Sequence, residues 1–351
     1  MIFRQLYDDT SSTYTYLLGD ESSREAILID PVFEQVQRDL ALLRELDLTL
    51  KLAVDTHAHA DHVTAAWLLK QHTGCLIGLS AAVEARNVDI ALSDGDRFGV
   101  RNINLDVRST PGHTNGCNTY VLEDQSMAFT GDALLIRGCG RSDFQQGDPA
   151  RLYQSITRQI FTLPDHCLIY PAHDYNGRTR STVAEEKQHN PRVGGQASEK
   201  DFIHYMQAMQ LPHPRKIDEA LPNNMRCGEP EDGNMPDEQH WADLRITLAG
   251  FPEVDPAWVV QNQPSVTILD VREPDEFRDG PQTLHNLVRI PIGELRDRIG
   301  EVPDNRPVVT LCRSGKRSSL ALGILRDAGH EQVANIRGGI LQWPEEDGEP
   351  D

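Results

Sequence analysis

The chain has 351 residues, of which 38% are hydrophobic, and it carries a formal net charge of −20. This length and apolar content favour two globular domains and exclude a fibrous or broadly disordered protein. The negative charge disfavours a nucleic-acid partner, because neutralising phosphates requires a basic surface.

The N-terminal sequence MIFRQLYDD places polar and charged residues where a secretory signal needs an apolar run, and no later stretch approaches membrane-spanning length. We therefore expect a cytoplasmic protein with no membrane partner. Six cysteines are scattered without a Cys-x-x-Cys pair, which argues against a zinc ribbon and a disulfide framework.

The first part of the chain has an α/β pattern. Apolar runs predict a hairpin-like pair of strands at 14–18 and 25–31, and helical spacing predicts a helix over 32–46. A buried strand at 50–54 and a helix at 65–73 place the residues between them in a strand-to-helix loop, where open α/β sheets commonly bind ligands. Further strands are predicted at 104–107, 118–122, 126–130 and 167–171.

Residues 227–239 are acidic, rich in glycine and proline and without apolar periodicity, which is typical of a linker. A new α/β pattern follows, with strands predicted at 266–269 and 308–311 and helices at 256–262, 292–299 and 318–328. The pattern predicts a first domain over 1–240, ending in a linker region at 227–253, and a second domain over 254–351.

Histidines and aspartates gather at four predicted strand ends. The motif THAHADH at 56–62 contains His57, His59, Asp61 and His62, and the later strands are followed by His113, Asp132 and His173. Metal sites need several imidazoles and carboxylates that converge on one point, and strand ends can supply them from distant parts of a chain. The sequence therefore predicts a metal centre.

These residues resemble the signature of the metallo-β-lactamase superfamily over roughly the first 240 residues, which implies an αββα sandwich. The stretches GHTNGC (112–117), RGCGRSDFQ (137–145), HDYNG (173–177), NPR (190–192) and MRCG (225–228) resemble persulfide dioxygenases. Hydroxyacylglutathione hydrolases, the competing family, typically have a second histidine where Cys117 stands and a longer C-terminal helical domain.

The resemblance implies that His57, His113 and Asp132 bind one Fe(II) and leave positions for a persulfide sulfur and O₂. It implies that His59, Asp61, His62 and His173 surround and orient these ligands. By the same resemblance Arg141, Tyr175 and Arg192 hold glutathione, and the planar fork of arginine suits a carboxylate-bearing tripeptide. The superfamily signature can instead hold two zinc ions, so a dizinc glutathione-thioester hydrolase with an appended sulfurtransferase or sensing domain stays open.

A second motif, LCRSGKRS at 311–318, joins a predicted strand to a predicted helix. Backbone N–H groups, the helix N-terminus and nearby cations favour negative charge in such a loop, which lowers a cysteine pKa and stabilises a bound anion. We therefore predict that Cys312 is a nucleophile that carries a persulfide. The loop that binds the sulfur anion consists of Arg313, Ser314, Gly315, Lys316, Arg317 and Ser318.

This loop, with LDVREPDEF (269–277) and RGGILQW (337–343), resembles a single rhodanese domain over about 254–344. That implies an α/β domain around a central parallel sheet. One stretch departs from the family: its usual GHIPGA is here TLHNLVRIP (283–291). Together the two resemblances imply a fusion in which one half oxidises glutathione persulfide with O₂ to sulfite and glutathione. The other half exchanges sulfur between thiosulfate and glutathione, and homo-oligomerisation is left open.

Overall fold

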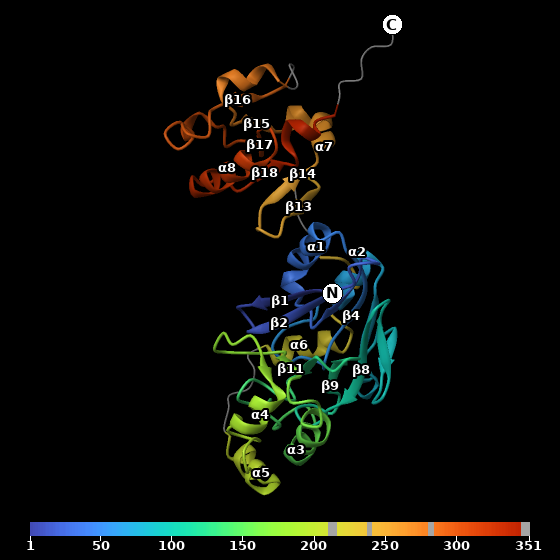
Figure 1. Cartoon of the computed structure of the whole chain (residues 1–351). Coiled ribbons are helices and arrows are strands. Elements are labelled where there is room, and N and C mark those ends of the chain that lie inside the picture. Colours follow the sequence, from blue (N-terminus) through green and yellow to red (C-terminus); the bar gives the residue numbers. More distant parts are fainter. Residues whose placement is uncertain (210–215, 237–240, 280–283, 345–351) are drawn as a thin grey trace. The chain divides into compact units, whose positions relative to one another are not determined.

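The computed structural model describes residues 1–209, 216–236, 241–279 and 284–344 (Figure 1). The chain forms two compact units, Met1–Pro236 and Asp237–Asp351. Residues 237–240, at the end of the predicted linker and first domain, and residues 345–351, at the predicted end of the second domain, lie outside the described residues.

The first unit contains two mixed sheets that pack face to face. Their facing side chains form one buried cluster, which includes Tyr16, Tyr120 and Phe129. The first sheet has the order β1 (Ile2–Asp8), β2 (Thr13–Gly19), β3 (Glu25–Ile29), β4 (Thr49–Val54), β5 (Leu76–Ser80) and β6 (Ile90–Leu92). The second has the order β12 (Ser181–Thr182), β11 (Leu168–Pro171), β10 (Met127–Gly131), β9 (Asn118–Leu122), β8 (Ile103–Ser109) and β7 (Arg97–Val100).

Helices cover the outer faces of both sheets. On the first sheet, α1 (Val36–Glu45) and α2 (Ala66–Thr73) bury Leu40 and Leu69 against Ile77 of β5. On the second sheet the covering helices are α3 (Pro149–Ser155), α4 (Val183–His189) and α5 (Glu199–Ala208). The predicted αββα sandwich is confirmed. A sixth helix, α6 (Ile217–Asn224), follows in the chain.

Parallel pairing brings the ends of distant strands to one edge of the first unit. β3 pairs with β4 in parallel, and β10 pairs with β11 in parallel. The THAHADH motif follows β4, Asp132 follows β10 and His173 comes soon after β11. The topology therefore collects residues that are more than a hundred positions apart in sequence.

The second unit is built around one sheet, whose two faces are covered by separate apolar clusters. The sheet confirms the predicted central parallel sheet, and only its first two strands, β13 and β14, run antiparallel to each other. Its order is β13 (Leu244–Ile246), β14 (Pro252–Val254), β18 (Val333–Ile336), β17 (Val308–Leu311), β15 (Thr267–Asp270) and β16 (Leu287–Arg289). The unit also contains α7 (Pro256–Asn262) and α8 (Lys316–Asp327).

The structure differs from the sequence prediction at the linker. Cys227 is buried in the first unit, where its carbonyl accepts a hydrogen bond from the backbone N–H of Trp67 at 3.0 Å. At the other end of the predicted linker region, β13 and β14 belong to the second sheet. These strands have only three residues each, too few to show an apolar alternation.

The segment 292–299, predicted as a helix, forms turns instead. Its apolar spacing still buries Leu295, which packs in the core without a regular helix. Gly293 lies within the segment, and glycine disfavours helix. Throughout the described ranges, the helices are too short or too polar to cross a bilayer.

A fragment that starts at residue 254 would lack β13 and the first two residues of β14. It would also lose Leu244 of β13 and Phe251, which pack on the two apolar clusters of the second unit. Burying one large apolar side chain contributes about 1.5–3 kcal/mol. We therefore expect the fragment 254–351 to have a free energy of unfolding at least about 2 kcal/mol lower than the fragment 237–351. Urea unfolding of both fragments measures this difference, and equal values would contradict it.

Candidate metal centre and cysteine loop

The histidine loop between β4 and α2 is buried. His57, His59 and His62 are each at most 2% exposed. The side-chain amide of Asn224, at the end of α6, donates hydrogen bonds to the carbonyls of His59 and His62, at 2.9 and 2.8 Å. The loop is therefore held by a distant helix as well as by its own strand.

The predicted metal ligands meet at one point. One donor atom from each of His57, His113 and Asp132 lies within 4.8 Å of the others. The structure gathers the four remaining predicted residues into an adjoining group of the same size: His59, Asp61, His62 and His173.

The backbone approaches the side chains of the metal-site loops so closely that two positions require glycine. Gly131 has φ +53°, and a Cβ there would lie 2.7 Å from Thr56 Oγ1. A Cβ on Gly140 would lie 2.8 Å from His113 Nδ1. Side chains at these positions would push the ligands apart.

Hydrogen bonds determine which nitrogen of each imidazole is free. His113 Nδ1 lies 2.6 Å from the carbonyl oxygen of Arg141, which can only accept, so this Nδ1 carries the proton. The Thr56 hydroxyl donates its proton to Asp30 Oδ2 at 3.0 Å. His57 Nδ1 lies 3.0 Å from the same hydroxyl oxygen, so this Nδ1 is the donor in that contact. In the neutral tautomer that these bonds select, each ring keeps its Nε2 available to bind a metal.

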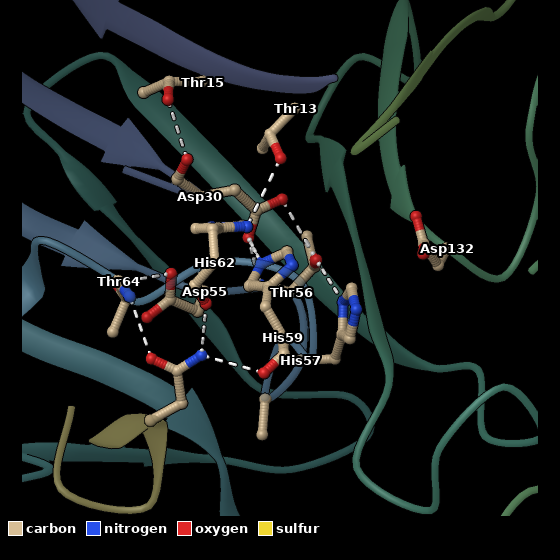
Figure 2. Close-up of polar contacts among 12 residues, drawn as sticks. Thr13, Thr15, Asp30, Asp55, Thr56, His57, His59, His62, Thr64 and Asp132 are labelled. Carbon is tan, nitrogen blue, oxygen red and sulfur yellow. Dashed lines mark hydrogen bonds and ion pairs between the residues drawn. The ribbon is translucent and has the colours of Figure 1, made fainter. Parts of the chain in front are cut away.

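The buried carboxylate of Asp30 anchors this network (Figure 2). Its Oδ1 accepts a hydrogen bond from the backbone N–H of Thr56 at 2.7 Å and lies 3.1 Å from His59 Nε2. Burial raises the pKa of Asp30, and the charge of His57 and the donors of Thr56 oppose the rise. One carboxylate thus orients two histidines of the loop.

The His173 ring bridges two carboxylates. Its Nδ1 lies 2.7 Å from Asp132 Oδ1 and its Nε2 lies 2.8 Å from Asp61 Oδ2, so both nitrogens donate. Burial lowers the pKa of His173, but the two carboxylates outweigh burial and raise it well above its ordinary value. In return, although burial raises the pKa of Asp132, His173 outweighs that effect and lowers it. Asp132 is therefore held ionised.

The donor set fits a metal ion. Asp132 Oδ2 lies 3.6 Å from His113 Nε2, and neither atom is taken up by the hydrogen bonds just described. Two further buried nitrogens, His59 Nδ1 and His62 Nε2, have no hydrogen-bond partner among the described residues. Unsatisfied buried nitrogens are costly, and imidazoles with a carboxylate suit iron or zinc. A metal-binding site of the kind expected for this fold is present.

A cavity of about 920 Å³ opens onto the site, and Asp132, His113 and His173 are part of its lining. The three predicted glutathione contacts, Arg141, Tyr175 and Arg192, all line it. Tyr175 is 69% exposed and its ring stacks on His173, with centroids 6.2 Å apart.

Arg141 pairs with Asp143 through Nε and Nη2, both at 2.6 Å, and its guanidinium lies over the Phe144 ring. Arg192 Nη1 donates to the carbonyl of Cys139 at 2.6 Å, so it supports the cavity wall as well as lining it. Sequence reasoning gave no role to six more lining residues that carry charge or sulfur: Arg137, Cys139, Asp174, Arg178, Met209 and Lys216.

The cavity wall at 137–141 is anchored by a buried glutamate. Glu186 accepts hydrogen bonds from the backbone N–H of Arg137 at 2.9 Å and from its guanidinium. Asn190 Nδ2 donates to the carbonyl of Gly138 at 3.0 Å. The wall that carries Arg141 is therefore positioned by α4 and the residues after it.

The cysteine loop lies between β17 and α8 in the second unit, with Cys312 directly after the strand. Gly315 has φ +86°, and Arg313, Ser314 and Lys316 are exposed. Burial raises the pKa of Cys312, but the Ser318 hydroxyl and loop N–H groups, that of Ser314 among them, outweigh it and lower the pKa.

Arg317 makes two hydrogen bonds of 2.6 Å to the carboxylate of Glu276, so its charge is partly neutralised. The structure brings Ser318 to 3.2 Å from the Cys312 sulfur.

The supporting residues are the part of the site that sequence reasoning missed. Asp30 gave one weak signal, since it ends an apolar run just before Pro31. Asn224 and Glu186 gave none, because a single polar residue within a helical segment is normally solvent-exposed.

Replacing Asp30 with Asn turns one of the two carboxylate oxygens into an N–H₂ group. Either the Thr56 N–H and His59, which face Oδ1, or the Thr56 hydroxyl, which donates to Oδ2, then lose their acceptor. We expect metal affinity to fall about 10–100-fold, the usual cost of losing a partner that orients the ligands. Metal retained after dialysis against a graded chelator measures it.

Asp55→Asn is the matched control. Burial raises the pKa of Asp55 well above its ordinary value, which favours the neutral carboxyl, and an amide is nearly isosteric with that form. It accepts from Thr64 rather than from the histidines. Equal metal retention in the two variants would contradict the role given to Asp30.

Family models match two parts of the chain: the metallo-β-lactamase superfamily over residues 8–173 and the rhodanese-like domain over 255–346. The human protein "Persulfide dioxygenase ETHE1, mitochondrial" is 51% identical over 228 residues, which cover 65% of this chain and 89% of that protein.

Two solved structures extend the comparison. The crystal structure of ETHE1 from Myxococcus xanthus is 52% identical with a TM-score of 0.63, covering 65% of this chain and all of that one. A metallo-β-lactamase from Staphylococcus aureus is 22% identical with a TM-score of 0.61 and covers 96% of this chain and 98% of that one, a likeness of fold alone. The chain therefore belongs to the persulfide dioxygenase family of the metallo-β-lactamase superfamily in its first unit and carries a rhodanese-like domain in its second.

Proposed function

We propose that this protein is a bifunctional enzyme of sulfur metabolism. Its first unit oxidises glutathione persulfide with O₂ and water to sulfite and glutathione, and its second transfers sulfane sulfur through Cys312. The observation that carries the proposal is that donor atoms of His57, His113 and Asp132 lie within 4.8 Å of one another, beside an arginine-lined cavity.

We assign the metal as one Fe(II) held by His57, His113 and Asp132. Bound there with three ligands from the chain, Fe(II) would have open positions and would supply the redox chemistry of O₂. His173 keeps Asp132 ionised, since it donates to Oδ1 and leaves Oδ2 free. The family relationship supports this assignment, because the human relative carries the name of a persulfide dioxygenase.

The cavity would bind the glutathione part of the substrate. Glutathione carries two carboxylates, and arginine recognises carboxylates through paired hydrogen bonds. Arg141 and Arg192 lie on the cavity wall that α4 positions, and Tyr175 presents a largely exposed ring beside His173. We therefore assign these three side chains to glutathione, as the family resemblance implies.

In the second unit the Cys312 thiolate would attack the outer sulfur of thiosulfate. A Cys–S–S⁻ bond forms, the sulfur–sulfur bond of thiosulfate breaks and sulfite leaves with the electron pair of that bond. A glutathione thiolate then attacks the outer sulfur of the persulfide, which gives glutathione persulfide and restores the Cys312 thiolate. Loop N–H groups that lower the Cys312 pKa support this role.

The two reactions would form a sequence, because the second unit releases the compound that the first consumes. Summed over both, one thiosulfate, one O₂ and one water give two sulfites and two protons, and glutathione is regenerated. Glutathione would thus act as a sulfur carrier between two sites in one chain.

We expect the purified protein to contain about one iron per chain and to consume O₂ when given glutathione persulfide. Asp132→Ala should lose the iron and lower O₂ uptake by more than about 100-fold, because it removes a ligand rather than a supporting group. Metal analysis and an oxygen electrode on the same sample measure both.

Asp124→Ala is the control, since Asp124 lies before β10 and, among the residues that the structure describes, bonds only to neighbouring Ser126. Iron content and O₂ uptake unchanged in Asp132→Ala would refute the ligand assignment.

Cys312→Ser should lower transfer of sulfur from thiosulfate to glutathione by at least about 100-fold, because a hydroxyl at neutral pH is a far weaker nucleophile than a cradled thiolate. Sulfite released from thiosulfate under anaerobic conditions measures this step alone. Ser319→Ala should keep the parent rate, because within the described part of the chain the Ser319 hydroxyl bonds only to the Lys316 carbonyl. Full transfer activity in Cys312→Ser would refute the rhodanese half of the proposal.

A second candidate for the first unit is a dizinc glutathione-thioester hydrolase. The observation that favours it is the second donor group around His59, Asp61 and His62, where two imidazole nitrogens have no partner within the described ranges. Two zinc ions per chain and hydrolysis of S-lactoylglutathione without O₂ uptake would select this candidate over the oxygenase.

A further inference from the structure

Buried polar side chains cross the centre of the sheet in the second unit. Thr310 on β17, Asn335 on β18 and Glu253 on β14 lie opposite one another in register. Thr310 and Asn335 are at most 1% exposed. Central strands of parallel sheets are usually apolar on both faces, and buried polar groups cost free energy unless they are paired. Packing alone gives no reason for this polar row.

Hydrogen bonds connect the row to the nucleophile. Asn335 Nδ2 donates to Glu253 Oε1 at 3.0 Å, and the Ser318 hydroxyl lies 2.6 Å from Asn335 Oδ1. The same hydroxyl lies 3.2 Å from Cys312 Sγ. Asn335 also lies against the loop itself, because its Nδ2 would be 3.2 Å from a Cβ on Gly315.

The chemistry of these groups sets the direction of each bond. An ionised carboxylate only accepts, so Glu253 fixes the Asn335 amide with its nitrogen toward Glu253 and its oxygen toward Ser318. The amide oxygen also only accepts, so the single Ser318 proton has two acceptors, Asn335 Oδ1 at 2.6 Å and Cys312 Sγ at 3.2 Å, and the shorter contact favours Asn335. When the thiol proton leaves to solvent, the Ser318 proton is the one that can turn to the sulfur.

We propose that Glu253 and Asn335 are positioning residues for Cys312, which compete with its sulfur for the Ser318 proton and so restrain formation of the thiolate. Turning the hydroxyl to the sulfur breaks its bond to Asn335, and that loss opposes the stabilising effect of the loop N–H groups. The inference rests on the proposed role of Cys312 as a nucleophile.

Restraint has a chemical use in sulfur transfer. Cys312 is both the attacking thiolate and, one step later, the leaving group, and intrinsic nucleophilicity falls as the pKa of a thiol falls. A thiol that ionises near the ambient pH attacks best, whereas a lower pKa makes it leave faster, so the pKa of Cys312 has to balance the two steps. The charged groups on the surrounding elements do not take part in this network of hydrogen bonds. They are Arg313, Lys316, Arg317 with Glu276, the buried pair Asp270 and Arg272, and the pair Arg337 and Asp255.

The test is the pH dependence of Cys312 alkylation in the full-length protein. A pulse of iodoacetamide at a series of pH values, with the Cys312 peptide quantified by mass spectrometry, gives the midpoint of ionisation. Asn335→Ala should move this midpoint down by about one pH unit, and Ser318→Ala should move it up. Glu253→Gln should act like Asn335→Ala but more weakly, because an amide at 253 allows the Asn335 amide to flip.

The decisive variant is the double one. If Asn335 acts through Ser318, then adding Asn335→Ala to Ser318→Ala should give no further shift. Thr267→Val is the matched control, since Thr267 is buried in the same sheet and its hydroxyl has no partner within the described ranges. It should keep the parent midpoint.

An unchanged midpoint in Asn335→Ala, or the same shift with and without Ser318, would overturn the proposal. If Asn335→Ala does not fold, as judged by circular dichroism, the nearly isosteric Glu253→Gln carries the test alone, and an unshifted midpoint there would overturn it. Alkylation needs no sulfur substrate, so a protein with shifted midpoints but no sulfurtransferase activity would refute the proposed function and leave this inference standing.

Discussion

The buried carboxylate of Asp30 is the contact on which the arrangement of the metal centre depends. It lies at the end of β3 with φ +52°, where its carbonyl accepts from Thr15 and its own N–H donates to the carbonyl of Val54. These bonds secure an unfavourable backbone conformation, and the side chain then fixes Thr56 and, through it, the free nitrogen of His57. The site is thus positioned by a buried side chain that does not line the cavity.

The cysteine loop follows the same design in an unrelated fold. Its predicted nucleophile, Cys312, stands at the end of a parallel strand, and its support comes from the buried Asn335 on the adjacent strand β18 and from the partly buried Glu253 on β14, one strand further. In each unit a carboxylate fixes the orientation of one polar side chain: Asp30 fixes Thr56, and Glu253 fixes Asn335. That side chain then accepts a hydrogen bond from a group next to the site, His57 in the first unit and Ser318 in the second. Reactive residues and their supports lie on different strands, so each fold positions its site through strand register.

The sequence predicts which histidines and aspartates gather at one place, but it does not predict the residues that support them. His57, His113 and Asp132 follow recognisable strands, and residues 118–122 and 308–311 form β9 and β17 as predicted. Asp30, Asn335 and Glu253 carry no motif, because a lone polar residue gains its role only from partners far away in the chain. The predicted linker region, 227–253, shows the same limit, because it includes the first residues of β14. No local sequence pattern indicates that β14 pairs with β18.

The central claim is that two sites in one chain carry out consecutive reactions with glutathione as the carrier. The most direct measurement supplies the full-length protein with thiosulfate, O₂ and a trace of glutathione, and follows thiosulfate, O₂ and sulfite together. The account predicts that each thiosulfate consumed takes up one O₂ and yields two sulfites, while glutathione is not depleted. One sulfite per thiosulfate without O₂ uptake would contradict it, because the sulfur would then stop at the persulfide.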